Sequence, residues 1–143
     1  AAELPVVPVS TLAALAQGHR RATGHLRVLA ALDARMSEVY WAACAPDAAG
    51  VMRVLGDERI VPPAEVPVPA DGGWHGAGPG WAAYGAILAG RLGDRVTAVS
   101  AEARCHARDV AQIAAADFAA GLAVPADQAL PVYLRDRVAW AKR

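Results

Sequence analysis

The residues best suited to binding chemistry are three glycines, Gly76, Gly78 and Gly80, in the run GAGPG. The surrounding pattern predicts a short strand at residues 74–75 and a helix over residues 81–92. A glycine turn between a strand and a helix lets the backbone approach a phosphate or a ring, and the helix N-terminus favours a negative charge. A simple tight connection uses the same residue types, because one glycine-rich turn is a weak signal by itself. The residues alone leave both interpretations open.

The histidines and cysteines do not form a recognisable catalytic or metal-binding pattern. Cys105 and His106, followed by Asp109, could suggest a metal or nucleophilic site, but adjacent residues on a helix point in different directions. The sequence contains no HExxH motif. We therefore predict neither a metal site nor a catalytic residue. The histidines are scattered and are expected at the surface or at the edge of the core: His19, His25, His75 and His106.

The composition is that of one globular domain without an excess of either charge. The 143 residues suffice to bury a core, and 14 basic and 14 acidic side chains give a formal net charge of zero. Nucleic-acid modules usually carry a basic patch, so contact with a nucleic acid is expected to run through partners. No signal peptide and no apolar run of membrane-spanning length is recognisable. Cys44 and Cys105 form no CxxC pair and are expected as buried or half-buried thiols in a reducing compartment, which favours the cytoplasm.

The hydrophobic periodicity predicts an α/β layer with a mixed sheet, because strands come first and then alternate with helices. The long second-half helix is expected to end near Ala120, with Val110, Ile113, Ala114 and Phe118 on its inner face, and to start either after Ser100 or after a break near Cys105. The strands are expected at 6–9, 27–32, 38–45, 51–55, 74–75 and 96–99, the other helices at 11–21 and 81–92, a proline-rich connector at 61–70, and an extended tail at 131–135.

Three segments, in order along the chain, resemble the TsaB-type (YeaZ-like) proteins. VSTLAALA at residues 9–16 is similar to the start of a helix in that family. LDARMSEVYW at residues 32–41 is similar to its most diagnostic hairpin, and PVYLR at residues 131–135 with VAW at residues 138–140 to its terminal segment. The resemblance covers nearly the whole chain. GPGW at residues 78–81 is similar to a shorter loop of the family.

The resemblance implies a ribonuclease H-like fold, because TsaB proteins belong to the two-lobed, actin-like ATPase superfamily whose lobes share it. The first lobe of the family begins with an AIDTS-type strand, and nothing similar is present here. We therefore expect residues 1–143 to be a single C-terminal lobe with the first lobe absent. The connector at residues 62–70 departs from the family, where a helix would be expected; a short turn starting at Pro63 is the most that its prolines allow.

The resemblance also assigns candidate nucleotide-binding residues, namely Asp33, Gly76, Gly78 and Gly80. In nucleotide-binding members of the superfamily, a second-lobe hairpin carries an Asp followed by glycines, whereas Asp33 is followed by Ala34, Arg35 and Met36. We favour the interpretation that Asp33 caps the turn and pairs with Arg35 or a backbone amide. For the glycines of this chain we prefer the tight connection. No cofactor is expected in this chain, although ATP or ADP could bind the full-length protein.

For function, the resemblance implies a non-catalytic scaffold that supports TsaD in placing threonylcarbamoyl on the tRNA adenosine beside the anticodon. A TsaE-type ATPase would be a further partner, and tRNA would be contacted only indirectly. The paralogue TsaD binds its metal through a His-x-x-x-His pair, and the matching positions here, Thr11 and Leu15, cannot replace it. The alternatives are a weak ATPase of the same superfamily and a glycoprotease homologue without a metal site.

Surfaces exposed by a missing lobe lead to two further expectations. Tyr133 and Arg135 are candidates for docking across the cleft or onto a partner, the alternative being that Tyr133 and Leu134 seal the core. The exposed face between the lobes is expected to be apolar, so we predict self-association into a homo-oligomer.

Overall fold

The central strand of the sheet is buried on both of its faces. In the computed structural model, which describes residues 3–135, this strand is β1, Val28–Arg35. Val28 and Ala30 point to one face and Leu29 and Ala31 to the other, and none of the four is exposed to solvent. A strand of this kind requires a layer of helix on each side of the sheet.

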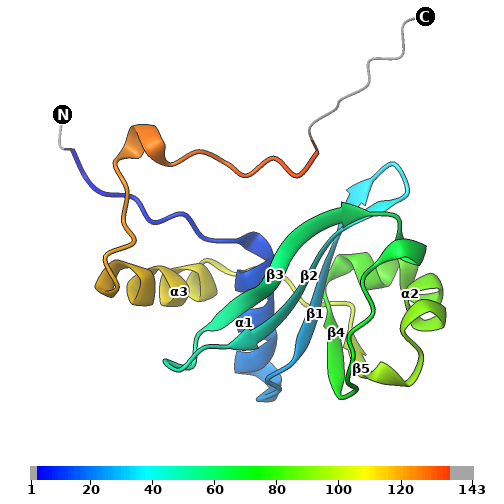
Figure 1. Ribbon diagram of the computed structural model, residues 1–143. Helices are drawn as coiled ribbons and strands as arrows, with labels where there is room; N and C mark the ends of the chain where they lie inside the picture. Colours follow the sequence, from blue (N-terminus) through cyan, green and yellow to red (C-terminus); the bar gives the residue numbers. More distant parts are fainter. Residues whose placement is uncertain (1–2, 136–143) are drawn as a thin grey trace, which may run out of the picture.

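The sheet is mixed and has five strands in the order β3-β2-β1-β4-β5. β1 and β2 form an antiparallel hairpin, β3 pairs antiparallel with β2, and β4 and β5 continue the sheet parallel to β1. The remaining strands are β2 (Glu38–Pro46), β3 (Met52–Val61), β4 (Trp74–Ala77) and β5 (Val96–Ser100). The predicted α/β fold with a mixed sheet and flanking helices is confirmed (Figure 1).

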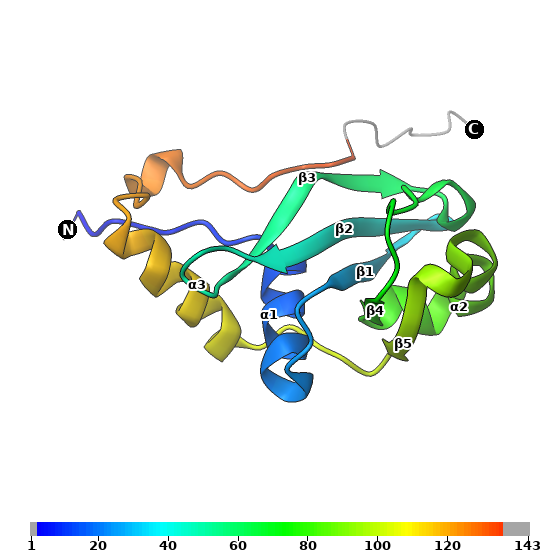
Figure 2. The same ribbon diagram turned by 60° about the horizontal axis from the view of Figure 1, so that its bottom comes forward.

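Helices α1 (Thr11–Thr23) and α2 (Pro79–Leu92) cover opposite faces of the sheet (Figures 1 and 2). Leu12 and Leu15 of α1 pack on Val28 and Ala30, whereas Trp81, Leu88 and Leu92 of α2 pack on the other face. The Ser10 hydroxyl accepts a hydrogen bond from the Ala13 amide at 3.1 Å, which confirms Ser10 as the N-cap of α1. No helix within residues 3–135 is both long and apolar enough to cross a membrane.

The third strand runs six residues beyond its predicted end at Leu55. The polar stretch that follows Leu55 has the composition of a turn, yet Ile60 and Val61 pair with Tyr40 and Val39 of β2. A bulge in the pairing and Gly56, at φ 72°, absorb the irregularity. Cross-strand pairing with the long strand β2 therefore overrides the local propensity.

Helix α3, Ala107–Ala119, packs on α1 through Ile113 and Val110 of the predicted apolar stripe and also through two buried carboxylates that the stripe did not include. Its start lies after the break near Cys105, which settles the ambiguity left by the sequence. Asp109, Ile113 and Asp117 face inward, while Phe118 is 59% exposed, so its expected inner position is wrong.

Two arginines outside α3 explain why Asp109 and Asp117 face inward. Arg21 of α1 binds the buried carboxylate of Asp109 with two hydrogen bonds of 2.9 Å. Arg53 of β3 lies 2.7 Å from the Asp117 carboxylate. A buried carboxylate needs such a partner, so the arginines decide which face of α3 turns inward.

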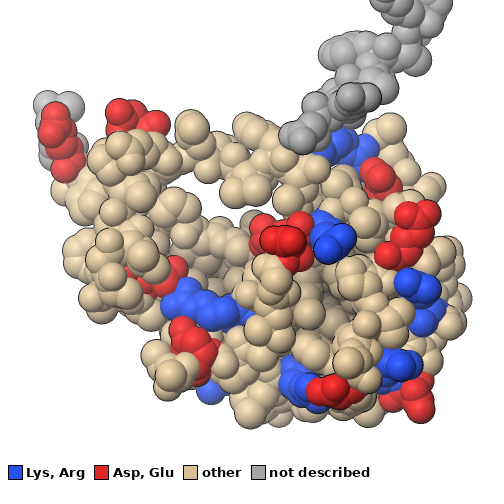
Figure 3. Space-filling model, viewed as in Figure 1, with Lys and Arg blue, Asp and Glu red and all other residues tan. Residues whose placement is uncertain are grey.

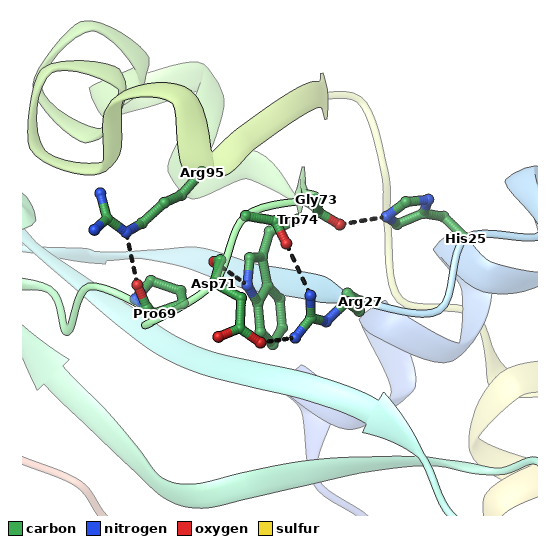
Figure 4. Close-up of polar contacts among 8 residues, drawn as sticks. His25, Arg27, Pro69, Asp71, Gly73, Trp74 and Arg95 are labelled. Carbon is green, nitrogen blue, oxygen red and sulfur yellow. Dashed lines mark hydrogen bonds and ion pairs between the residues drawn. The ribbon is translucent and has the colours of Figure 1, made fainter.

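The proline-rich connector between β3 and β4 is held by side chains because its prolines lack amide hydrogens. It forms only one short turn, η1 (Pro63–Glu65), which confirms the expected departure from a helix. Arg91 donates to the Val66 carbonyl at 3.1 Å. Arg95 donates to the Pro69 carbonyl at 2.7 Å, as Figure 4 shows. These arginines extend from the end of α2 and from the turn that follows it, and they fix the connector against that side of the sheet.

The contact of α3 with α1 predicts that glycine-to-alanine substitutions at two helix positions change the free energy of unfolding in opposite directions. Gly18 lies inside α1, and a Cβ added there would meet Asp109 Oδ2 at 2.8 Å. Alanine is the better helix former by about 1 kcal/mol, but this contact would displace the carboxylate from Arg21. We expect Gly18→Ala to lower the free energy of unfolding by about 1–2 kcal/mol, measured by urea denaturation.

Gly90 of α2 is the matched control, because a Cβ there would meet no atom within 4 Å. Gly90→Ala should raise the free energy of unfolding by about 0.5–1 kcal/mol. A stabilising effect of both substitutions would contradict the role given to the Asp109 contact.

Candidate functional site

The tip of the β1–β2 hairpin is a turn of three consecutive left-handed residues. Arg35, Met36 and Ser37 have φ values of 64°, 51° and 60°, a region that residues other than glycine enter at a cost. The Asp33 Oδ1 accepts a hydrogen bond from the Arg35 amide at 2.9 Å, and its Oδ2 lies 3.8 Å from the Arg35 guanidinium. The interpretation that Asp33 caps the turn and pairs with Arg35 is confirmed.

The three candidate glycines are accounted for by packing inside the chain. A Cβ on Gly76 would lie 2.4 Å from the Trp81 ring, and one on Gly80 would lie 2.8 Å from the Ala31 backbone carbon. Gly78 has φ 108°, and a Cβ there would lie 2.5 Å from the Ala31 oxygen. The Gly78 amide donates to the Ser100 carbonyl at 3.1 Å, and the Trp81 indole donates to the Leu29 carbonyl at 3.0 Å. These contacts are those of a tight connection between β4 and α2.

The structure brings the hairpin and the glycine turn to the same edge of the sheet. β1 and β4 are parallel, and β4 ends at Ala77 opposite Ala30, so the glycine turn follows β4 on the side toward which β1 runs on to the hairpin. Asp33 lies just beyond the part of β1 that the glycines contact. The carboxyl edge of parallel strands is where ligands commonly bind in α/β sheets, but here hydrogen bonds and packing within the chain involve Asp33 and all three glycines.

The extended segment 129–135, which we call the strap, ends on the same hairpin. Arg135 forms an ion pair of 2.5 Å with Glu38 and donates to the Ala34 carbonyl at 3.2 Å. The hairpin and terminal motifs found in the sequence therefore meet in space. Tyr133 is 76% exposed, so the alternative that it seals the core is wrong. The docking role of Tyr133 and Arg135 stays a prediction, and residues 138–140 of the terminal motif lie outside the described residues.

A groove of about 700 Å³ lies between the strap, the N-terminal arm (residues 6–12) and the sheet. Figure 3 shows this hollow beneath the strap. Leu32 and Tyr40 form its floor, and the Ser10 hydroxyl donates to the Glu58 carboxylate at its side. The volume is in the range of ligand pockets, and the walls are largely apolar.

Thr11 and Leu15, which the resemblance aligns with a metal-binding pair, differ in burial. Thr11 is exposed and lines the groove, whereas Leu15 is fully buried in the core between α1 and the sheet. Among residues 3–135, no three His, Cys, Asp or Glu side chains are arranged to hold a metal ion.

Three histidines gather at the opposite end of the sheet, contrary to the expectation that they are scattered. His19 Nε2 lies 3.2 Å from His75 Nδ1, and the rings of His25 and His75 are stacked with centroids 3.4 Å apart. Burial, followed by the two neighbouring imidazoles, lowers the pKa of His19 below its usual value. Burial and then His25 lower the pKa of His75. The sequence gives no local sign of this cluster, because His19 and His75 lie on different elements 56 residues apart.

The remaining reactive side chains do not converge with one another. His106 is exposed, and the Asp109 carboxylate is bound to Arg21. Burial raises the pKa of the Cys44 thiol to about 12, so this thiol stays protonated. Cys105 is exposed, which corrects the expectation that both thiols are at least half-buried.

Comparison with known proteins found two curated relatives. No protein-family model matches the chain. The tRNA threonylcarbamoyladenosine biosynthesis protein TsaB of Escherichia coli (strain K12) is 40% identical over 144 residues, which is 99% of this chain and 62% of the relative. TsaB of Haemophilus influenzae is 28% identical over 150 residues, 99% of this chain and 61% of the relative. The chain thus spans about three fifths of the length of these relatives.

Solved structures give the same result for the fold. YeaZ from Pseudomonas aeruginosa superposes with a TM-score of 0.80 at 44% identity, over 91% of this chain and 59% of that one. A second structure, described as an uncharacterized protein with similarity to peptidase YEAZ from Pseudomonas aeruginosa, has a TM-score of 0.81 at 44% identity. It matches 92% of this chain and 59% of its own. These neighbours agree with the expected ribonuclease H-like fold.

The left-handed hairpin tip generates a prediction for stability. Ser37→Gly removes the steric cost of φ 60°, which stabilises the folded chain. It also raises the conformational entropy of the unfolded chain, which destabilises the fold by a smaller amount. We expect the free energy of unfolding to rise by about 0.5 kcal/mol in thermal denaturation.

Ala98 is the control, since it is exposed on β5 with ordinary strand geometry. Ala98→Gly should lower the free energy of unfolding by about 0.5–1 kcal/mol. A loss of stability in Ser37→Gly of the same size as in the control would show that the tip carries no strain.

Proposed function

We propose that this chain, which belongs to the TsaB (YeaZ) family, acts in the biosynthesis of threonylcarbamoyladenosine in tRNA as a binding subunit without a catalytic role. The observation that carries the proposal is the 40% identity to the TsaB of Escherichia coli over 99% of this chain. The name of that relative states involvement in this biosynthesis. The division of labour within the biosynthesis is our inference from the contacts of the candidate residues.

The contacts of the candidate residues support a binding role. Asp33 is held by the turn it caps, and the glycines of residues 76–80 are packed on Ala31 and Trp81. Close approach of a phosphate needs glycine amides that are free to face it, whereas the Gly78 amide already donates to Ser100. The residues that would organise a nucleotide in related ATPases therefore stabilise the fold here.

We propose a TsaD-type catalytic subunit as the main partner and a TsaE-type ATPase as a further one. The tRNA would be reached through them, because the net charge is zero and acidic and basic side chains are interspersed on the face in Figure 3. We propose a cytoplasmic location, because the biosynthesis named for the relatives acts on tRNA. That the chain is one lobe of a longer, two-lobed protein stays a prediction, as does ATP or ADP binding by that protein.

A chimera tests the assignment to this biosynthesis. The region of Escherichia coli TsaB that matches this chain is replaced by residues 1–143, and the chimera is the sole TsaB in the cell. We expect the threonylcarbamoyladenosine content of total tRNA, measured by nucleoside mass spectrometry, to stay within about twofold of that of wild-type cells, because about 40% identity over a common fold preserves partner surfaces.

Asp33→Ala in the same chimera separates binding from catalysis. A binding subunit keeps most of the modification, since only a turn cap of about 1 kcal/mol is lost. Loss of the modified nucleoside, while a soluble chimera still co-purifies with the TsaD subunit, would contradict the non-catalytic role. Loss in the unsubstituted chimera at normal abundance would contradict the assignment itself.

A further inference from the structure

Three imidazoles from three segments of the chain meet at the end of the sheet remote from the hairpin. His19 lies in the last turns of α1, His25 in the loop that leads to β1, and His75 in β4. His75 is at the centre, hydrogen-bonded to His19 at 3.2 Å and stacked on His25 with an angle of 4° between the ring planes. His19 is only 3% exposed. The cluster plays no part in the proposed function.

The hydrogen bonds restrict how many protons the cluster can hold. A carbonyl can only accept, so His25 Nε2 donates to the Gly73 carbonyl at 2.9 Å (Figure 4) and that nitrogen carries a proton. Between His19 Nε2 and His75 Nδ1, one nitrogen must donate and the other must accept. When both rings are cationic, every nitrogen carries a proton, and this bond becomes a repulsive contact between two positive charges.

Within residues 3–135, the carboxylates near the cluster are paired with arginines and are not free to offset added protons. On the connector before β4, Asp71 is paired with Arg27 at 2.6 Å, and that guanidinium stacks on Trp74 (Figure 4). On α3, Asp109 is paired with Arg21 at 2.9 Å. On the loop before α3, Arg104 donates to the carbonyls of Ala101 and Ala103 and lies 3.8 Å from Glu102. Arg20 of α1 points toward Gly50.

We propose that His19, His25 and His75 form a proton-operated latch that fastens the end of α1 and the following loop to the start of β4. At neutral pH the latch is closed, with the His19–His75 hydrogen bond and the His25–His75 stack in place. Repulsion opens the latch when two further protons are added and make two of the three rings cationic. Opening the latch releases residues 23–27 and residues 71–75 from each other. The His75 amide, which donates to the Arg27 carbonyl at 2.9 Å, joins the same two segments.

The direction of the pH dependence follows from the two lowered pKa values. The folded chain holds protons on His19 and His75 less tightly than the unfolded chain, whose imidazoles titrate near 6.5. The latch is therefore at full strength above pH 6.5 and weakens as the pH falls below it. For each proton taken up on opening, the opening constant rises about tenfold per pH unit. The salt-bridged carboxylates Asp47 and Asp109 have lowered pKa values and titrate at more acidic pH.

Amide hydrogen exchange, resolved by NMR on the complete chain, measures the opening. The probe is the His75 amide, and the reference is the Ala14 amide, which donates to Ser10 at 2.9 Å at the other end of α1. After correction for intrinsic exchange, we expect protection of His75 to fall at least tenfold from pH 6.5 to pH 5.5 while that of Ala14 stays unchanged. Equal protection of His75 at both pH values overturns the latch, as does an equal loss at Ala14.

Substitutions then assign the effect to the cluster. His19→Gln keeps a hydrogen-bonding side chain but cannot be charged, so the pH-dependent loss at His75 should shrink to less than threefold. His106→Gln is the matched control, because His106 is exposed and outside the cluster, and it should behave as the wild type. If His19→Gln fails to fold, the imidazole resonances of the wild-type chain decide. Titration of His19 together with loss of the His75 amide supports the latch, and titration of His19 without that loss overturns it.

Discussion

The close approach of the glycine turn to the backbone of β1 is the constraint on which the rest of the structure depends. Ala30 and Ala31 are small and fully buried, which leaves room for α1 on one face and for the glycine turn on the other. The space available at Gly78 and Gly80 is limited by the Ala31 backbone itself. Because backbone cannot move aside as a side chain can, only glycine satisfies these contacts. The same strand carries Asp33 and the hairpin, so this packing also fixes where the family's diagnostic motif lies.

The sequence was sufficient to predict the parts of the fold that depend on local chemistry. The cap at Ser10, the hairpin around Asp33 and the proline-rich connector follow from residue types whose backbone preferences are strong. The first two have a direct hydrogen-bonding reason that the structure confirms. The end of β3 could not be predicted, because residues with turn propensity become strand through pairing with β2.

Charged groups that pair over long sequence distances were the other features that local reasoning missed. The orientation of α3 depends on Arg21 and Arg53, neither of which lies near the helix in sequence. Periodicity alone therefore placed Phe118 on the wrong face. The histidine cluster could not be predicted from the sequence either, because His19 and His75 approach each other only after β4 has joined the sheet beside β1. For the candidate site, the family resemblance raised nucleotide binding, whereas the turn chemistry favoured a cap at Asp33 and a tight connection at the glycines, and the contacts agree with the turn chemistry.

The binding role proposed for this chain requires a surface and a stable frame rather than a reactive group. The strap illustrates such a frame, because Arg135 joins the end of the described chain to the hairpin through Glu38 and Ala34. The most direct test of the proposed non-catalytic role is ATP turnover by a TsaB-family protein that contains this chain, alone and with a TsaD-type subunit, for the wild type and Asp33→Ala. We expect no turnover by the protein alone and no change on substitution of Asp33. Robust turnover by the protein alone that Asp33→Ala abolishes would contradict it.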